Sequence, residues 1–107
     1  MKTLARDAPI EEVFDYIQSN PVAIILFVDQ TKFCNEFSNY PWVRSESAVV
    51  EIDQEILDSL QIGVVPQFRF YVHGNEVASI RGTCPYEEFQ GTKSKVFANV
   101  EYLEDYR

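Results

Sequence analysis

The sequence predicts one α/β domain spanning residues 1–107, with a mixed β-sheet of four to five strands and helices on both faces. Two patterns predict this class. Val22–Val28 is a continuous, β-branched-rich apolar run, which is typical of a strand buried on both faces. Helical and strand patterns then alternate before a hairpin, in which Phe68, Phe70 and Val72 lie at alternate positions.

The first elements follow from apolar spacing and from residues that break helices. Residues 2–4 form a weak strand pattern, and Pro9 then suits the first turn of a helix. The helix ends at the Ser-Asn-Pro sequence of residues 19–21, just before the apolar strand. Its expected core-facing side consists of Ile10, Val13, Phe14 and Ile17, at positions i, i+3, i+4 and i+7.

The middle of the chain predicts a short helix over 34–39, closed by Asn-Tyr-Pro, and a second strand over 48–53. A further short helix follows, and Gly63 is expected to end it. The His-Gly-Asn sequence of residues 73–75 predicts the hairpin turn, with a return strand over 77–80. The last helix opens at Cys84 and Pro85, and its expected apolar side consists of Phe89, Val96, Phe97, Val100 and Leu103.

Composition and charge exclude several functional classes. The net charge is −8 and the nine Lys and Arg residues are scattered, which argues against nucleic-acid binding and favours a basic protein partner. The longest apolar run is too short for a membrane helix, and the N-terminus lacks a signal-peptide pattern, so we expect a cytoplasmic protein without a membrane partner. Two cysteines and one histidine do not form a metal-site pattern, and nothing indicates a cofactor.

Two segments, taken in order, resemble the thioredoxin family. The first is the aromatic–cysteine pair Phe33-Cys34, a few residues after the apolar strand. The second is "IGVVPQFRFYVHGNEVASIRG", in which the family's positions are filled by Ile62, Gly63, Val65, Pro66, Gly74, Val77 and Gly82. The resemblance covers roughly residues 22–97. It implies a thioredoxin-like fold, a cis peptide bond before Pro66, and a groove there that presents Val65 to an extended peptide.

The redox motif of the family is degenerate in this sequence. Cys-x-x-Cys reads "CNEF", so Cys34 matches the attacking cysteine and Phe37 occupies the resolving position. A dithiol enzyme needs the second thiol to resolve the mixed disulfide, so the ordinary reductase cycle cannot close. The position of the family's buried acid falls on Val28, with Asp29 one step away, and the second helix is shortened.

The reactivity of the two cysteines stays open at this stage. Cys34 at a helix N-terminus could be an activated thiolate, supported by Lys32 and opposed by Glu36, or an inert apolar residue. The resemblance places Cys84 at the rim of the substrate groove, where it is either a resolving thiol for Cys34 or a separate thiol. Tyr40 and Trp42 are interpreted as packing residues, with an exposed recognition patch as the alternative.

Two functions follow from these features. The first is a redox-silent or weakly redox-active binding or assembly domain, chaperone-like, which holds a protein partner or an extended peptide. Its groove would consist of Phe33, Phe37, Val65, Pro66 and Gly82. The alternative is a monothiol disulfide oxidoreductase with Cys34 as nucleophile, resolved by Cys84 or by glutathione. The sequence does not indicate an oligomeric state.

Overall fold

The computed structural model describes residues 3–105, with side chains up to residue 98. Its sheet has the strand order β2-β1-β3-β4, with β1 parallel to β2 and antiparallel to β3, and β3 antiparallel to β4. The strands are β1 (Val22–Val28), β2 (Ala48–Glu51), β3 (Gln67–Val72) and β4 (Asn75–Arg81). The helices are α1 (Ile10–Ser19), α2 (Lys32–Ser38), α3 (Pro41–Glu46), α4 (Gln54–Leu60) and α5 (Tyr86–Asp105).

Helices cover both faces of this mixed sheet, as the sequence predicts. α1 and α4 pack on one face, where Ile25 and Phe27 of β1 are fully buried. α2, α3 and the N-terminal part of α5 pack on the other, where Leu26 and Val28 are fully buried. β1 therefore contributes to both cores, which explains why its sequence is apolar at every position.

Capping residues fix where several of these elements begin and end. The Thr31 hydroxyl accepts a hydrogen bond from the Cys34 backbone N–H at the start of α2, and the Asp53 carboxylate accepts one from the Ile56 N–H at the start of α4. In the hairpin turn, His73 and Gly74 both have positive φ, which is the requirement of a tight two-residue turn.

Several expectations about element boundaries are wrong. Thr3 and Leu4 form no strand, while Lys2 lies outside the described residues. The backbone of this N-terminal arm, residues 3–9, contacts β2 through the Glu51 N–H, which donates to the Arg6 carbonyl at 2.7 Å. α4 is ended by Gln61 in the left-handed region and not by Gly63.

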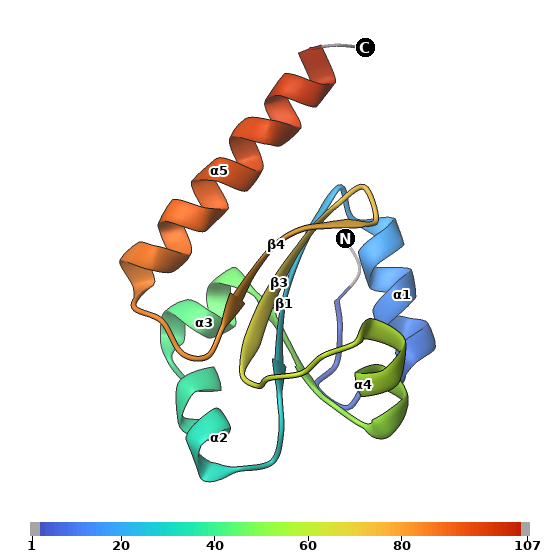
Figure 1. Ribbon diagram of the computed structural model, residues 1–107, viewed down its shortest axis with the longest axis vertical. Helices are drawn as coiled ribbons and strands as arrows, with labels where there is room; N and C mark the ends of the chain where they lie inside the picture. Colours follow the sequence, from blue (N-terminus) through green and yellow to red (C-terminus); the bar gives the residue numbers. More distant parts are fainter. Residues whose placement is uncertain (1–2, 106–107) are drawn as a thin grey trace.

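Two aromatic residues of the helices also lie elsewhere than expected. Phe14 of α1 is 43% exposed and Phe97 of α5 is 41% exposed, because each lies at the edge of its helix's buried stripe. Val13 and Val96, their neighbours in sequence, are buried instead. The C-terminal part of α5 projects beyond the sheet (Figure 1), and the side chains of Val100 and Leu103 lie outside the described ones. No helix within residues 3–105 is long and apolar enough to cross a membrane.

Candidate functional site

The predicted redox position lies in the first turn of α2, directly after the loop that follows β1. Cys34 is the third residue of this helix and its side chain points into the core, because it belongs to the apolar cluster of that face and is 2% exposed. Burial raises the pKa of the Cys34 thiol, and the nearby Asp29 carboxylate raises it further. The thiol is therefore protonated at neutral pH and shielded from reagents.

The family position of the buried acid is occupied by Val28, which is fully buried in the core. The acidic residue near the Cys34 thiol is the next residue, Asp29. The Asp29 carboxylate accepts hydrogen bonds from the Thr31 hydroxyl at 2.6 Å and from the Thr31 N–H at 3.0 Å. These bonds, together with one from the Cys34 thiol, lower the pKa of Asp29. The lowered pKa of Asp29 makes this carboxylate a weak base, and the raised pKa of Cys34 makes the thiol a weak acid, so transfer of the thiol proton to Asp29 is unfavourable.

Phe37, in the resolving position, is an integral part of the hydrophobic core. Its side chain is 4% exposed, and its ring packs edge-to-face against three other aromatic rings. The centroid of the Phe37 ring lies 5.7 Å from that of Tyr40, 5.9 Å from that of Trp42 and 5.8 Å from that of Phe68. The space that a second thiol would need is thus taken up by aromatic packing.

Cys84 lies at the junction between β4 and α5 and is also buried, at 8% exposure. Burial, with a smaller contribution from the Glu88 carboxylate, raises the pKa of Cys84 to about 11. Both Cys34 and Cys84 are free thiols that contribute to the same apolar cluster. Neither thiol has the lowered pKa that marks a nucleophilic cysteine.

A hollow of about 300 Å³ opens between α2, the start of α3 and the loop before α5. It brings together three of the predicted site residues, Phe33, Phe37 and Cys84. The remaining lining residues are Glu36 and Thr83, which the sequence did not assign to the site, and Tyr40, for which it gave an exposed recognition patch as the alternative to packing. A signal for the position of Tyr40 is Pro41, because proline is favoured at the first position of a helix. It indicates that a new helix, α3, begins directly after Tyr40.

The other predicted groove residues lie beside this hollow and do not line it. The Val65–Pro66 peptide bond is cis, and the Pro66 carbonyl accepts a hydrogen bond from the Gly82 N–H at 2.8 Å. Gly82 directly precedes Thr83, so this contact connects Pro66 to the wall of the hollow. Val65 is half-buried and packs against both apolar clusters, so much of its side chain faces the core.

The aromatic residues after α2 divide between core and surface. Trp42 is half-buried and packs against Phe68, Tyr86 and Phe89, with centroid distances of 6.0, 5.2 and 5.2 Å. Tyr40, by contrast, is 51% exposed at the edge of the hollow. The packing interpretation therefore holds for Trp42, whereas the alternative of an exposed surface applies to Tyr40.

A side chain of the N-terminal arm holds α2 against β2. The Arg6 guanidinium lies 3.2 Å from the Glu51 carboxylate and donates to the Ser38 hydroxyl at 3.2 Å. Its third hydrogen bond goes to the Asn35 side-chain oxygen. Because Asn35 and Ser38 both belong to α2, these bonds fix the helix that carries Phe33 and Cys34.

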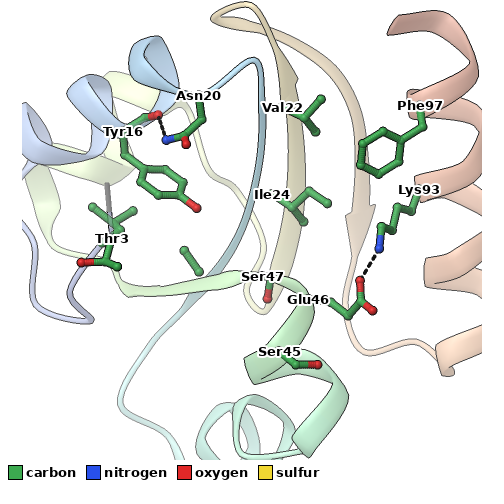
Figure 2. Close-up of a pocket in the computed structure, with 12 residues that line it drawn as sticks. Thr3, Tyr16, Asn20, Val22, Ile24, Ser45, Glu46, Ser47, Lys93 and Phe97 are labelled. Carbon is green, nitrogen blue, oxygen red and sulfur yellow. Dashed lines mark hydrogen bonds and ion pairs between the residues drawn. The ribbon is translucent and has the colours of Figure 1, made fainter. Parts of the chain in front are cut away.

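A second and larger hollow, of about 500 Å³, is lined by neither cysteine and lies between α1, β1, α5 and the junction of α3 with β2 (Figure 2). Val22 and Ile24 of β1 lie between Tyr16 on one side and Phe97 on the other, and Lys93 is hydrogen-bonded to Glu46. Among the described residues, no group of three or more His, Cys, Asp or Glu side chains could hold a metal ion. The larger hollow thus offers neither a thiol nor a metal-binding cluster.

Known structures share the fold of this chain and resemble it only distantly in sequence. No family model and no curated protein matches the sequence. A thioredoxin variant from Halobacterium salinarum is similar at 17% identity and a TM-score of 0.61, covering 80% of this chain and 82% of the other. A thioredoxin from Plasmodium falciparum is similar at 15% identity and 0.60, covering 87% and 98%.

A third structure supports the same architecture. A chain in the crystal structure of a complex of ferredoxin:thioredoxin reductase with thioredoxin f2 has a TM-score of 0.67 at 12% identity, covering 84% of this chain and 92% of that one. Likeness at such low identity establishes backbone architecture and leaves activity to be argued from the site itself. The four-stranded mixed sheet, the helices on both of its faces and these structural neighbours together show that the chain has a thioredoxin-like fold.

Proposed function

We propose that this chain is a protein-binding domain with a thioredoxin-like fold that works without dithiol chemistry. It holds an extended segment of a partner protein at the hollow beside the Pro66–Gly82 contact, as an assembly factor or a chaperone does. The observation that carries the proposal is a contrast within α2. Cys34 is 2% exposed, whereas Phe33, its neighbour in sequence, is 54% exposed.

The environment of the thiols supports a redox-silent site. Thiol–disulfide exchange requires an accessible thiolate as the attacking group. The pKa of Cys34 is raised by burial, and that of Cys84 is raised to about 11. Phe37 supplies core packing where a resolving thiol would be needed. Each of these features lowers the rate of a redox cycle at neutral pH.

The surface around the hollow supports partner binding. Phe33 and Tyr40 expose about half of their surface on adjacent walls of a cavity that also reaches Thr83. Exposed aromatic groups around a concavity are typical of protein-interaction sites, because they bury much apolar area at small entropic cost. A partner segment crossing the hollow would cover these rings. The location of this binding in the cytoplasm stays a prediction from the sequence.

Selection of binding peptides tests the proposal directly. Twelve-residue peptides are selected from a displayed library on the wild-type chain and are then measured against three variants by fluorescence polarisation. We expect Phe33→Ala to weaken binding by about tenfold or more, since a central aromatic anchor is removed. Phe14→Ala is the matched control, because Phe14 is a similarly exposed phenylalanine on α1. Cys34→Ser should bind like the wild type, and loss of binding in that variant would contradict the proposal.

The chemistry of Cys34 provides a separate test. Native chain is treated with iodoacetamide at pH 7, and the modified cysteine is identified by mass spectrometry after digestion. We expect alkylation of Cys34 to be much slower than that of an exposed model thiol, because its raised pKa leaves little thiolate. Rapid modification of Cys34 in the folded protein would instead favour the monothiol oxidoreductase.

A further inference from the structure

We propose that the hollow between α2, α3 and the α5 junction receives a cationic side chain, a lysine or an arginine, from the partner segment. This inference rests on the proposed function and names the chemistry of the group that enters the site. It is carried by the arrangement of aromatic faces and carboxylates around the hollow, which is independent of the state of the two thiols.

The aromatic rings form a corner that suits a cation. Tyr40 lines the hollow and is 51% exposed, and its ring packs at an interplanar angle of 73° against the buried Phe37 ring, which supports it. Phe33 forms part of a further wall and is 54% exposed. A lysine or arginine side chain packs its methylene groups on exposed rings such as those of Phe33 and Tyr40, and its charge is attracted to the ring faces.

Negative charge lies at the same hollow. Glu36 is the charged residue among the described lining of the hollow, and its side chain is 66% exposed. Glu88 lies in the first turn of α5, four residues after Cys84, where its N–H donates to the Pro85 carbonyl. It is close enough to Cys84 to raise the pKa of that thiol. The Glu36 carboxylate in the lining and the Glu88 carboxylate near Cys84 therefore both favour a cation from the partner.

The ion pair between Lys32 and Glu36 leaves the Glu36 carboxylate able to attract a cation from the partner. Lys32 lies 3.8 Å from Glu36, but its side chain is 88% exposed. An exposed i,i+4 ion pair contributes very little stability, so a better-placed cation displaces it at small cost. The volume of about 300 Å³ is at the lower end for ligand pockets, which fits one long side chain.

The experiment compares four short peptides by NMR titration of the ¹⁵N-labelled full chain. The probes are acetyl-Val-X-Val-amides in which X is arginine, lysine, citrulline or norleucine. Citrulline keeps the shape of arginine without its charge, and norleucine keeps the methylene stem of lysine. We expect the arginine and lysine peptides to shift the amide signals of Phe33, Tyr40 and Thr83 and to bind about fivefold more tightly than their neutral partners. Raising the salt concentration to 0.5 M should reduce this ratio.

Two variants separate the charge from the rings. Glu36→Gln should lower the affinity for the lysine and arginine peptides and leave that for norleucine unchanged. Glu55→Gln is its matched control, since Glu55 is an exposed glutamate on α4, which packs against the other face of the sheet. Tyr40→Leu keeps an apolar side chain but removes the ring, so it should weaken the cationic peptides more than norleucine.

The outcomes distinguish this inference from the proposed function. Equal affinity of all four peptides, with the same amide signals shifted, would refute the cation preference and leave the peptide-binding site in place. Shifts confined to amides away from α2 and Thr83 would overturn the location of the binding site and thus both proposals. Absence of binding by the charged peptides at millimolar concentration would also overturn the cation site, and the library selection then decides whether the hollow binds peptides at all.

Discussion

Replacing Phe37 with alanine measures how firmly the residue in the resolving position is built into the core. The ring is 4% exposed and contacts Tyr40, Trp42 and Phe68 edge-to-face. Alanine removes the ring and leaves a cavity among side chains from the start of α3 and from β3. We therefore expect a large loss of stability from this one substitution.

The size of the loss follows from the contacts. Truncation of a buried phenylalanine to alanine costs about 3–5 kcal/mol, which already includes the cavity left behind. Three aromatic contacts, each adding about 0.5–1.5 kcal/mol to a pair, place Phe37 toward the upper half of that range. With a urea m-value of about 2 kcal/mol/M for a domain of this size, a loss of about 4 kcal/mol lowers the unfolding midpoint by about 2 M.

Urea unfolding of the variant gives this number directly. The fluorescence of Trp42, the single tryptophan, reports on the ring cluster itself, and far-UV circular dichroism reports on the whole chain. Phe33→Ala is the matched control: Phe33 is 54% exposed, so its loss should change stability by about 0.5 kcal/mol or less. A loss below about 1 kcal/mol for Phe37→Ala, or equal losses for both variants, would refute the packing argument.

Three further predictions concern backbone conformation and thiol chemistry. Gln61→Gly should raise the urea midpoint, because Gln61 has φ 53° at the end of α4 and glycine removes the cost of about 1 kcal/mol that a side chain has in this left-handed conformation. A lower midpoint would contradict this. Gly74→Ala should lower the free energy of unfolding by about 1 kcal/mol or more, since Gly74 has φ +85° and a Cβ there would lie 2.8 Å from the Gln18 side chain. Gly63→Ala is the control, because a Cβ at Gly63 has open space, and equal losses in the two variants would contradict the prediction. Alkylation of Cys84 should accelerate up to about pH 11, the pKa of its buried thiol, and a plateau below pH 9 would be inconsistent with that burial.

Much of the fold could be predicted from the sequence because burial leaves a direct trace in residue patterns. β1 begins and ends where the apolar run does, since a strand covered on both faces is apolar throughout. The hairpin follows from alternation in β3 and from a turn with glycine at a positive φ. These signals depend on neighbours in sequence, so no knowledge of tertiary contacts was needed.

Features that depend on tertiary contacts could not be predicted in the same way. Phe14 and Phe97 fit the apolar spacing of their helices but lie at the edges of the buried stripes, and spacing alone does not show where a helix meets the sheet. The left-handed turn at Gln61 uses a residue that carries no such preference, so Gly63 was the more reasonable expectation. α3 is only six residues long and buries one side chain, Val43, which gives too few apolar positions for a periodic signal.

The candidate site also combines residues that the sequence predicts with features that depend on tertiary packing. The sequence identified Phe33 and Phe37 from positions in the family motif and Cys84 from the loop that the resemblance places at the groove, and the hollow brings these three residues together. It did not reveal that the Cys34 side chain turns into the core, since the rotation of α2 about its axis is set by packing against the sheet. Glu36 and Tyr40 join the site for the same reason.

The hydrogen bonds from Arg6 to α2 connect the N-terminal arm to the helix that lines the hollow. The guanidinium contacts Asn35 and Ser38 on the helix and Glu51 on β2. A partner that binds better when α2 is in this position must, by reciprocity, also favour the docked arm. We therefore expect a bound peptide to slow cleavage of the arm by proteases. A change in the first residues of the chain would in turn alter peptide affinity at a surface that those residues do not line.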